Sequence, residues 1–143
     1  MNSLVGTEEY IAPEIITDSS LSYASDYWSL GIILYQLFCG KTPFKGANES
    51  ETFRNIQSNK DVEFKEHLQV PETARNLISM LLVKDPEKRL GKDGIEYIMQ
   101  HEYFENVSWQ TVLSEKVPFS PPVRPKRPIA RPGSKYASFA LPT

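Results

Sequence analysis

The stretch "YASDYWSLGIILYQLFCG", residues 23–40, decides the fold of this chain. We count four polar members in this apolar run: Ser25, Asp26, Ser29 and Gln36. A helix that is apolar on nearly every side is usually surrounded by protein. Ser22 or Ser25 can cap the start of the helix, and Gly40 can end it in a left-handed conformation. The stretch therefore predicts a central helix around which the other elements pack.

Three further helices are predicted after this one. Residues 48–58 form a short amphipathic candidate, with Phe53 and Ile56 three positions apart. Residues 72–85 lie between two prolines and carry apolar residues at helical spacing, namely Ala74, Leu77, Ile78, Leu81 and Leu82. Residues 95–100 form a last short helix. Strand patterns are weak throughout, so we expect an all-α body.

The distribution of charge divides the chain near Glu115. The net charge is −2, but all 18 acidic residues lie at or before Glu115, together with only ten of the 16 basic residues. The remaining six basic residues and seven of the 11 prolines lie after it. We expect a folded body at residues 1–115 and an extended, largely disordered Pro-rich tail at residues 116–143.

Length and composition exclude several classes of protein. A chain of 143 residues suits one compact domain. The longest apolar run is too short to span a bilayer, and the first ten residues lack signal-peptide features, so we expect an intracellular, cytoplasmic chain without a transmembrane segment. Cys39 is the single cysteine, and His67 and His101 have no metal-ligand spacing with it, so no metal site is expected.

Five segments occur in a characteristic order: "VGTEEYIAPEII", "SDYWSLGIILYQL", "GKTPF", "LLVKDPEKRLG" and "HEYFENVSW". Over residues 3–109 they resemble the carboxy-terminal lobe of a eukaryotic protein kinase. The pair Gly6-Thr7 before Ala-Pro-Glu is similar to that of serine/threonine kinases. The chain looks most like the phosphoinositide-dependent protein kinase family. The resemblance implies a kinase-like carboxy-terminal-lobe fragment, with a central apolar helix, packed helices and a Pro-rich tail.

The resemblance gives structural roles to three charged residues. Glu14 has apolar neighbours, and a carboxylate buried there needs a cationic partner. The family pairs this glutamate with the arginine that is here Arg89, whose guanidinium can hold a carboxylate through two hydrogen bonds. The family's equivalent of Asp26 accepts hydrogen bonds from the catalytic-loop backbone. From the residues alone, a solvated Glu14 and an Asp26 stabilised by the helix dipole remain open.

Residues 3–7 resemble the end of the family's activation segment. Ser3 matches the residue that these kinases phosphorylate. An ordinary exposed serine is the alternative, because no basic residue precedes Lys41 to bind a phosphate. Thr7 matches an accessory threonine that hydrogen-bonds the catalytic aspartate and lysine. The loop that seats the protein substrate is matched by Leu4, Val5 and Gly6.

The motifs that hold ATP and magnesium do not occur in this sequence. It contains no Gly-x-Gly-x-x-Gly, no Val-Ala-x-Lys, no His-Arg-Asp and no Asp-Phe-Gly. Phosphoryl transfer depends mainly on positioning and charge stabilisation around ATP and magnesium. The intact family uses both, but we expect no cofactor and no catalysis from this chain alone. Its expected partners are a protein substrate or the amino-terminal part of a kinase.

The tail suggests an alternative function, a non-catalytic interaction module. Three Pro-x-x-Pro frames, at residues 118–121, 122–125 and 125–128, lie among basic residues. This composition favours the polyproline II conformation that SH3-type and WW-type domains bind. A plain Pro-rich linker is the other possibility. The six basic residues predict no specific nucleic-acid binding.

Overall fold

The computed structural model describes residues 8–18 and 21–123. They belong to two compact units, one ending at Val107 and the other beginning at Ser108. The compositional boundary near Glu115 lies inside the second unit, so the division into residues 1–115 and 116–143 stays a prediction. None of the helices in the described ranges has the length and apolar character needed to cross a membrane.

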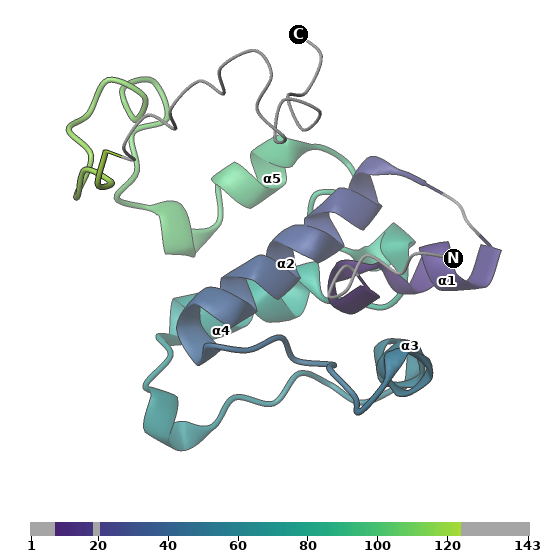
Figure 1. Cartoon of the computed structure of the whole chain (residues 1–143). Helices are drawn as coiled ribbons and strands as arrows, with labels where there is room; N and C mark the ends of the chain where they lie inside the picture. Colours follow the sequence, from purple (N-terminus) through teal and green to yellow (C-terminus); the bar gives the residue numbers. More distant parts are fainter. Residues whose placement is uncertain (1–7, 19–20, 124–143) are drawn as a thin grey trace, which may run out of the picture. The chain divides into compact units, whose positions relative to one another are not determined.

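The first unit is built from helices, and the described residues contain no β-strand (Figure 1). Its α-helices are α1 (Pro13–Asp18), α2 (Tyr23–Cys39), α3 (Glu49–Gln57), α4 (Glu72–Leu81) and α5 (Ile95–Met99). Its short 3-10 helices are η1 (Glu8–Tyr10), η2 (Glu66–Leu68), η3 (Pro86–Lys88) and η4 (Glu102–Phe104). The prediction of an all-α, kinase-like fold is confirmed.

The two ends of α2 are formed differently from one another. Gly40 closes the helix with φ 73°, and its N–H donates to the carbonyl of Gln36 at 2.8 Å. This left-handed conformation costs a glycine little. At the other end Ser22 is the N-cap residue, but its side chain makes no capping hydrogen bond. The hydroxyl of Ser25 donates to Glu14 instead, so the suggestion that Ser25 caps the helix is wrong.

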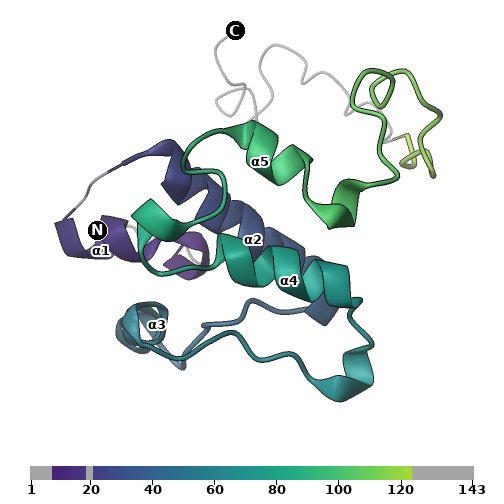
Figure 2. The same ribbon diagram turned by 180° about the vertical axis from the view of Figure 1, so that it is seen from behind.

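Helix α4 packs along α2, and the two views of the ribbon agree on this arrangement (Figures 1 and 2). Gly31 makes the close approach possible, because a Cβ at this position would lie 2.8 Å from Cδ2 of Leu82. The apolar residues predicted for α4 are all buried: Ala74, Leu77, Ile78, Leu81 and Leu82. The predicted end at residue 85 is too late, since the carbonyls of Val83 and Lys84 accept hydrogen bonds from Arg89.

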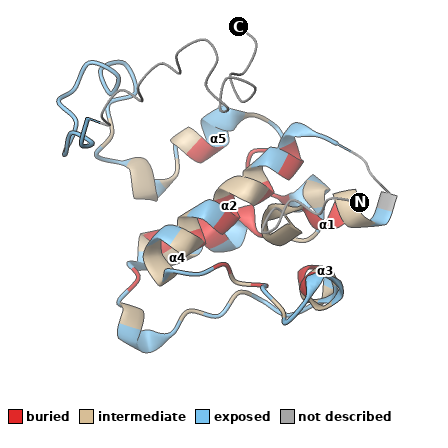
Figure 3. Cartoon of the chain, in the orientation of Figure 1, coloured by how far each residue is buried: buried red, intermediate tan, exposed pale blue. Residues whose placement is uncertain are grey.

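The larger part of the core lies where α2, α3 and α4 converge. Trp28 and Phe44 stack with their ring centroids 5.6 Å apart, and Ile56 of α3 is fully buried beside them. Asn48 caps α3 by accepting a hydrogen bond from the backbone N–H of Glu51. Figure 3 shows the buried residues recurring on α1, α2 and α3.

One face of α2 remains exposed to solvent. Asp26, Leu30, Ile33 and Leu37 are spaced by four, three and four positions, so they share a face of the helix. Leu30 is half-buried and packs against the cluster of Leu77, Leu81 and Ile98, so we call the exposed members, Asp26, Ile33 and Leu37, the open face of α2. The side chains of Ile33 and Leu37 are 45% and 75% exposed. The expectation of a helix surrounded by protein is therefore wrong for this face.

The second unit is described from Ser108 to Val123. Backbone N–H groups of Val112 and Glu115 donate to the carbonyls of Ser108 and Thr111 at 2.9 and 3.1 Å, which forms a compact series of turns. The described residues after Glu115 are all exposed, and the Pro-x-x-Pro frame at 118–121 lies among them. The frame at 122–125 is described only at residues 122 and 123, and the frame at 125–128 lies wholly outside the described residues.

Candidate functional site

The predicted substrate-side residues lie outside the described part of the chain. This group consists of Ser3, Leu4, Val5, Gly6 and Thr7. The described part of the same segment begins with η1 and continues into α1. The candidate site therefore consists of residues 8–18 and the side chains that hold them against the helical body.

Glu14 and Arg89 form an ion pair through two hydrogen bonds. Nη1 of Arg89 donates to Oε1 of Glu14 at 2.7 Å, and Nη2 donates to Oε2 at 2.9 Å. Both side chains are buried: that of Arg89 is 0% exposed and that of Glu14 is 7% exposed. Burial by itself raises the pKa of Glu14, but hydrogen bonds from Arg89, from the backbone and from Ser25 outweigh it, so that the pKa is lowered. The carboxylate is thus held in its charged form.

The remaining donors of Arg89 are also satisfied. Nη1 donates to the carbonyl of Ala24 at 2.6 Å, and Nε donates to that of Val83 at 2.9 Å. The guanidinium carbon lies 5.2 Å from the ring centroid of Trp28. A buried charge is tolerated when it is paired and its hydrogen bonds are made. Arg89 therefore connects α1, the start of α2 and the loop after α4.

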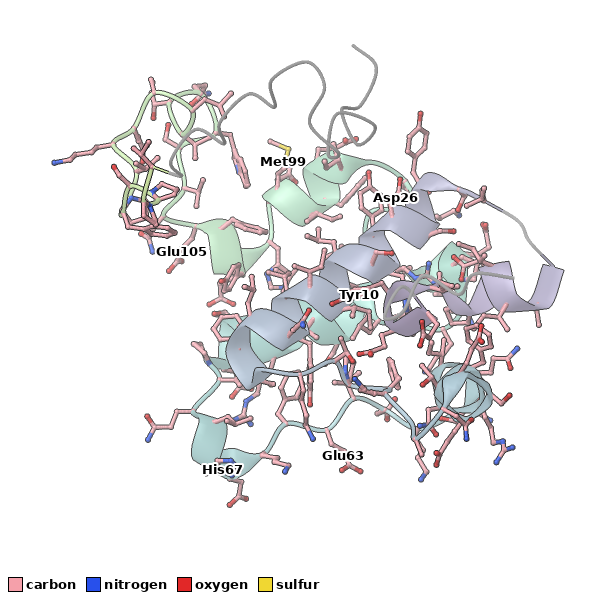
Figure 4. The ribbon with its side chains drawn as sticks, viewed as in Figure 1. Tyr10, Asp26, Glu63, His67, Met99 and Glu105 are labelled. Atoms are coloured by element: carbon pink, nitrogen blue, oxygen red, sulfur yellow. The ribbon has the colours of Figure 1, made fainter. Side chains whose placement is uncertain are left out.

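Side chains also hold η1 against α2 and the loop that follows it. The hydroxyl of Tyr10 donates to Oε1 of Gln36 at 2.7 Å, and the hydroxyl of Ser29 donates to the carbonyl of Tyr10 at 2.8 Å. Figure 4 shows Tyr10 beside the middle of α2. These partners are missed by sequence reasoning because they are ordinary polar residues from distant positions. The helical spacing of Ser29 and Gln36 carries no sign of a partner in η1.

Lys84 is a second functional candidate, and no sequence motif marks it as one. Its Nζ donates to the carbonyl of Ile56 at 2.7 Å and lies 3.9 Å from the ring centroid of Phe44 and 5.1 Å from that of Trp28. Burial lowers the pKa of Lys84 to about 8, against the opposing charge of Asp61. The position of Lys84 directly after an apolar run is the one feature of the sequence that indicates its partial burial. The lysine ties α3 to the end of α4.

Asp26 lies near the amino-terminal end of α2 and is exposed (Figure 4). The structure does not bring it to Glu14 or Arg89. No group of three His, Cys, Asp or Glu side chains suited to a metal ion occurs in residues 8–18 or 21–123. The ring of His101 is used in two other contacts. Its Nε2 lies 2.8 Å from Oδ1 of Asn76, and its Nδ1 accepts a hydrogen bond from the backbone N–H of Tyr103.

The sequence model of the family described as "Protein kinase domain" matches residues 1–104. The chain belongs to the protein kinase family. Flippase kinase 1 of Saccharomyces cerevisiae is 44% identical over 121 residues, which are 84% of this chain and 13% of that protein. A protein kinase of Oryza sativa subsp. indica, called the Oryza kinase below, is 43% identical over 143 residues, which are 99% of this chain and 24% of that protein.

Another kinase relative, the serine/threonine-protein kinase WAG1 of Arabidopsis thaliana, is 44% identical over 117 residues, which are 81% of this chain and 25% of that protein. The chain thus spans a quarter or less of the length of these three relatives. The predicted membership of the serine/threonine kinases is confirmed. The similarity to the phosphoinositide-dependent protein kinases stays a prediction.

Proposed function

We propose that this chain forms the substrate-side part of a serine/threonine protein kinase, which transfers a phosphoryl group from ATP to serine or threonine of proteins. The observation that carries the proposal is the Glu14–Arg89 pair, because it fastens the segment directly after Leu4–Gly6 to the helical body. The names of the relatives support the same class of reaction. We extend the proposal to the phosphoinositide-dependent subfamily on the similarity of "NSLVGT" and "HEYFENVSW".

The chemistry itself would be supplied by residues that this sequence does not contain. ATP and magnesium need a phosphate cradle and metal-binding carboxylates. The sequence has none of the corresponding motifs, and the described residues hold no cluster of metal ligands. These residues therefore do not fit ATP or magnesium. We propose that the chain is inactive alone, and that it acts within the cytoplasm, where ATP is present.

The open face of α2 is the surface on which the missing part would pack. Asp26 gives this face an exposed carboxylate at one end, and Leu37 gives it an exposed apolar side chain near the other. A segment that carries the catalytic loop would satisfy the carboxylate through its backbone N–H groups and cover the apolar residues. The resemblance gives Asp26 this same partner. Thr7 would then reach the catalytic aspartate and lysine, and a phosphate on Ser3 would meet basic residues of the added segment.

The first experiment tests the chain alone. The purified chain is incubated with radiolabelled ATP, magnesium or manganese, and a generic serine/threonine peptide, and calorimetry follows ATP binding. We expect no turnover above that of an Asp26→Ala control and no ATP affinity at the micromolar level. Turnover above that of the control, or micromolar affinity for ATP, would contradict the proposal, because either result would require a nucleotide site in these residues.

The second experiment supplies the missing part covalently. In a chimera the chain replaces the matching 24% of the Oryza kinase, to which it aligns over 99% of its own length. We expect the chimera to phosphorylate the peptide, and we expect Asp26→Ala to lower that activity while Lys88→Ala, at an exposed position, leaves it unchanged. A folded chimera that binds ATP but transfers no phosphate would count against the proposal.

The interaction module remains the second prediction from the sequence. Its Pro-x-x-Pro frame at 118–121 is exposed, as an SH3-type or WW-type ligand must be. Titration of the chain with such domains, against a Pro118→Ala and Pro121→Ala double variant, tests it. Sequence-dependent binding together with an inactive chimera would favour the interaction module over the kinase.

A further inference from the structure

A pocket of about 290 Å³ opens in the first unit, between the loop that follows α2 and the loop that joins α3 to η2. A water molecule takes up about 30 Å³ of liquid volume, so the pocket has room for a small ligand of several heavy atoms. The charged residues that line it are Lys41, Lys60, Asp61, Glu63 and Lys65. Neither Glu14 nor Arg89 lines it, so it is separate from the ion pair described above.

Hydrogen bonds hold both loops of this pocket in place. The hydroxyl of Tyr35 in α2 donates to the carbonyl of Glu63, which lies on the second loop, at 2.9 Å (Figure 4). Nδ2 of Asn55 in α3 donates to the carbonyl of Phe44, on the first loop, at 3.1 Å. Each loop is thus tied to a helix by a side chain. The pocket is therefore formed in the chain without a ligand, as binding sites usually are.

The three lysines of the pocket have no partner in the part of the chain that the structure describes. The ammonium groups of Lys41, Lys60 and Lys65 make no hydrogen bond and no ion pair there, and all three residues are exposed. The other lysines of the first unit are used: Lys45 pairs with Glu9, Lys88 with Asp85 and Lys92 with Glu87, and Lys84 donates to the carbonyl of Ile56. The unpaired ammonium groups of the described first unit thus all line one pocket.

The two carboxylates of the pocket do not neutralise these lysines. Asp61 and Glu63 form no ion pair with them, and the charge of Asp61 acts on Lys84, whose pKa it raises against the effect of burial. The lining residues carry three positive and two negative charges, which leaves a net charge of +1. An anion that contacts the ammonium groups would therefore gain partners that the protein itself does not supply.

We propose that the lysine pocket, defined by Lys41, Lys60 and Lys65, binds a small soluble anion that carries a diphosphate group. Lysine binds phosphate as a compact point charge, so three ammonium groups from two loops suit a ligand that spreads several negative charges over two phosphates. The contacts would be exposed to solvent and screened by salt, so we expect a dissociation constant of about 0.1–1 mM at low ionic strength. The inference goes beyond the proposed kinase function and does not depend on it.

The first arm of the test measures binding to the chain alone. Inorganic diphosphate is titrated into the chain, calorimetry gives the dissociation constant, and amide chemical shifts of residues 58–65 locate the site. Inorganic phosphate carries fewer charges and should bind about tenfold more weakly. Equal affinity for the two anions would overturn the assignment to a diphosphate group. Shift changes confined to residues outside the pocket would overturn its location.

The second arm uses variants. Lys41→Ala, Lys60→Ala and Lys65→Ala should each weaken diphosphate binding about threefold, and the triple variant should abolish saturable binding. Glu63→Gln removes a negative charge from the pocket and should tighten binding about threefold. Lys88→Ala is the matched control, because Lys88 is exposed but does not line this pocket, and it should bind as the wild type does. Thermal melting of each variant verifies that it is folded, since the three lysines make no contacts whose loss would unfold the chain.

The remaining outcomes separate the pocket from general charge attraction and from the proposed function. A Lys88→Ala chain that loses as much affinity as Lys60→Ala would overturn the inference, because any surface lysine would then serve. A glutamate-rich peptide that binds more tightly than diphosphate would also overturn it and assign the pocket to an acidic protein segment. An inactive chimera would contradict the kinase function alone, whereas unchanged diphosphate binding in the triple variant would contradict the lysine pocket alone.

Discussion

The carboxylate of Glu14 and the guanidinium of Arg89 are 75 positions apart in the sequence and meet at 2.7 and 2.9 Å. The same guanidinium also donates hydrogen bonds to the carbonyl of Ala24 in the first turn of α2 and to that of Val83 in the loop after α4. Three segments of the chain thus depend on one side chain. Because the pair is buried, removal of either partner leaves a charge without compensation.

Arg89→Ala should lower the free energy of unfolding by on the order of 3–5 kcal/mol, because Glu14 would remain buried without its cation. Denaturation by urea measures the change. Lys88→Ala is the matched control, since the side chain of Lys88 is 78% exposed and its pair with Asp85 lies at the surface. An Arg89→Ala chain that melts at the temperature of the wild type would show that the pair is exposed or absent.

The stabilisation from Glu14 should disappear in acid. Its pKa is lowered in the folded chain, so its contribution is fully present above the ordinary value of 4.5 and is lost as pH falls through the folded pKa. We compare the stability of the wild type with that of Glu14→Gln between pH 7 and pH 2. The difference should shrink below about pH 4.5. A difference that stays constant throughout would mean that the folded pKa of Glu14 is not lowered.

Lys84 should make stability rise with pH as well, but in the alkaline range. Its pKa falls to about 8 on folding, so above pH 8 the unfolded chain binds more protons and stability rises with pH toward 10.5. Tyr35, whose pKa is raised to about 12 mainly by burial, reverses the slope above its ordinary value of 10. The rise is therefore expected between about pH 8 and 10.

The matched variants for this rise are Lys84→Met and Lys88→Met. Lys84→Met keeps an unbranched side chain beside the rings of Trp28 and Phe44 but cannot titrate, so the stability of this variant should rise less over this window. Lys88→Met should behave as the wild type does, since Lys88 is exposed. Equal slopes in all three chains would contradict the assignment to Lys84.

The open face of α2 should make the isolated chain self-associate or bind a hydrophobic dye, because contiguous exposed apolar surface promotes association. Leu37→Lys places a charge in this face and should shift sedimentation toward the monomer. Leu21→Lys is the control, as Leu21 is 81% exposed but lies before α2 begins. A wild-type chain that sediments as a clean monomer, melts sharply and binds no dye would refute the prediction.

The helices could be predicted because their signals are local. The apolar spacing of α4 and the terminating Gly40 both act within a few positions, and the structure has each of them in its expected place. Predictions that depend on distant partners succeed only in part. The position of Ser25 alone suggests a helix cap, but its hydroxyl is used by Glu14.

The contacts of Glu9 and Lys84 had no local signal. Thr42 and Lys45 are ordinary loop residues in the sequence, and only the path of the chain after α2 brings them to Glu9. Lys84 acquires its half-buried position because the fold places the carbonyl of Ile56 in α3 at its ammonium group. Sequence periodicity describes which face of an element is apolar, but it does not say which polar groups meet across elements.

The sequence by itself determined the helices, the central position of α2 and, through the resemblance, the pairing of Glu14 with Arg89. Backbone propensity and apolar periodicity are properties of neighbouring residues, so they can be read along the chain. The tertiary structure alone decided which face of α2 stays open, that Lys84 is half-buried beside two rings and that Glu9 contacts the loop after α2. These features depend on how much surface each element covers on another, and that is fixed only when the whole chain has packed.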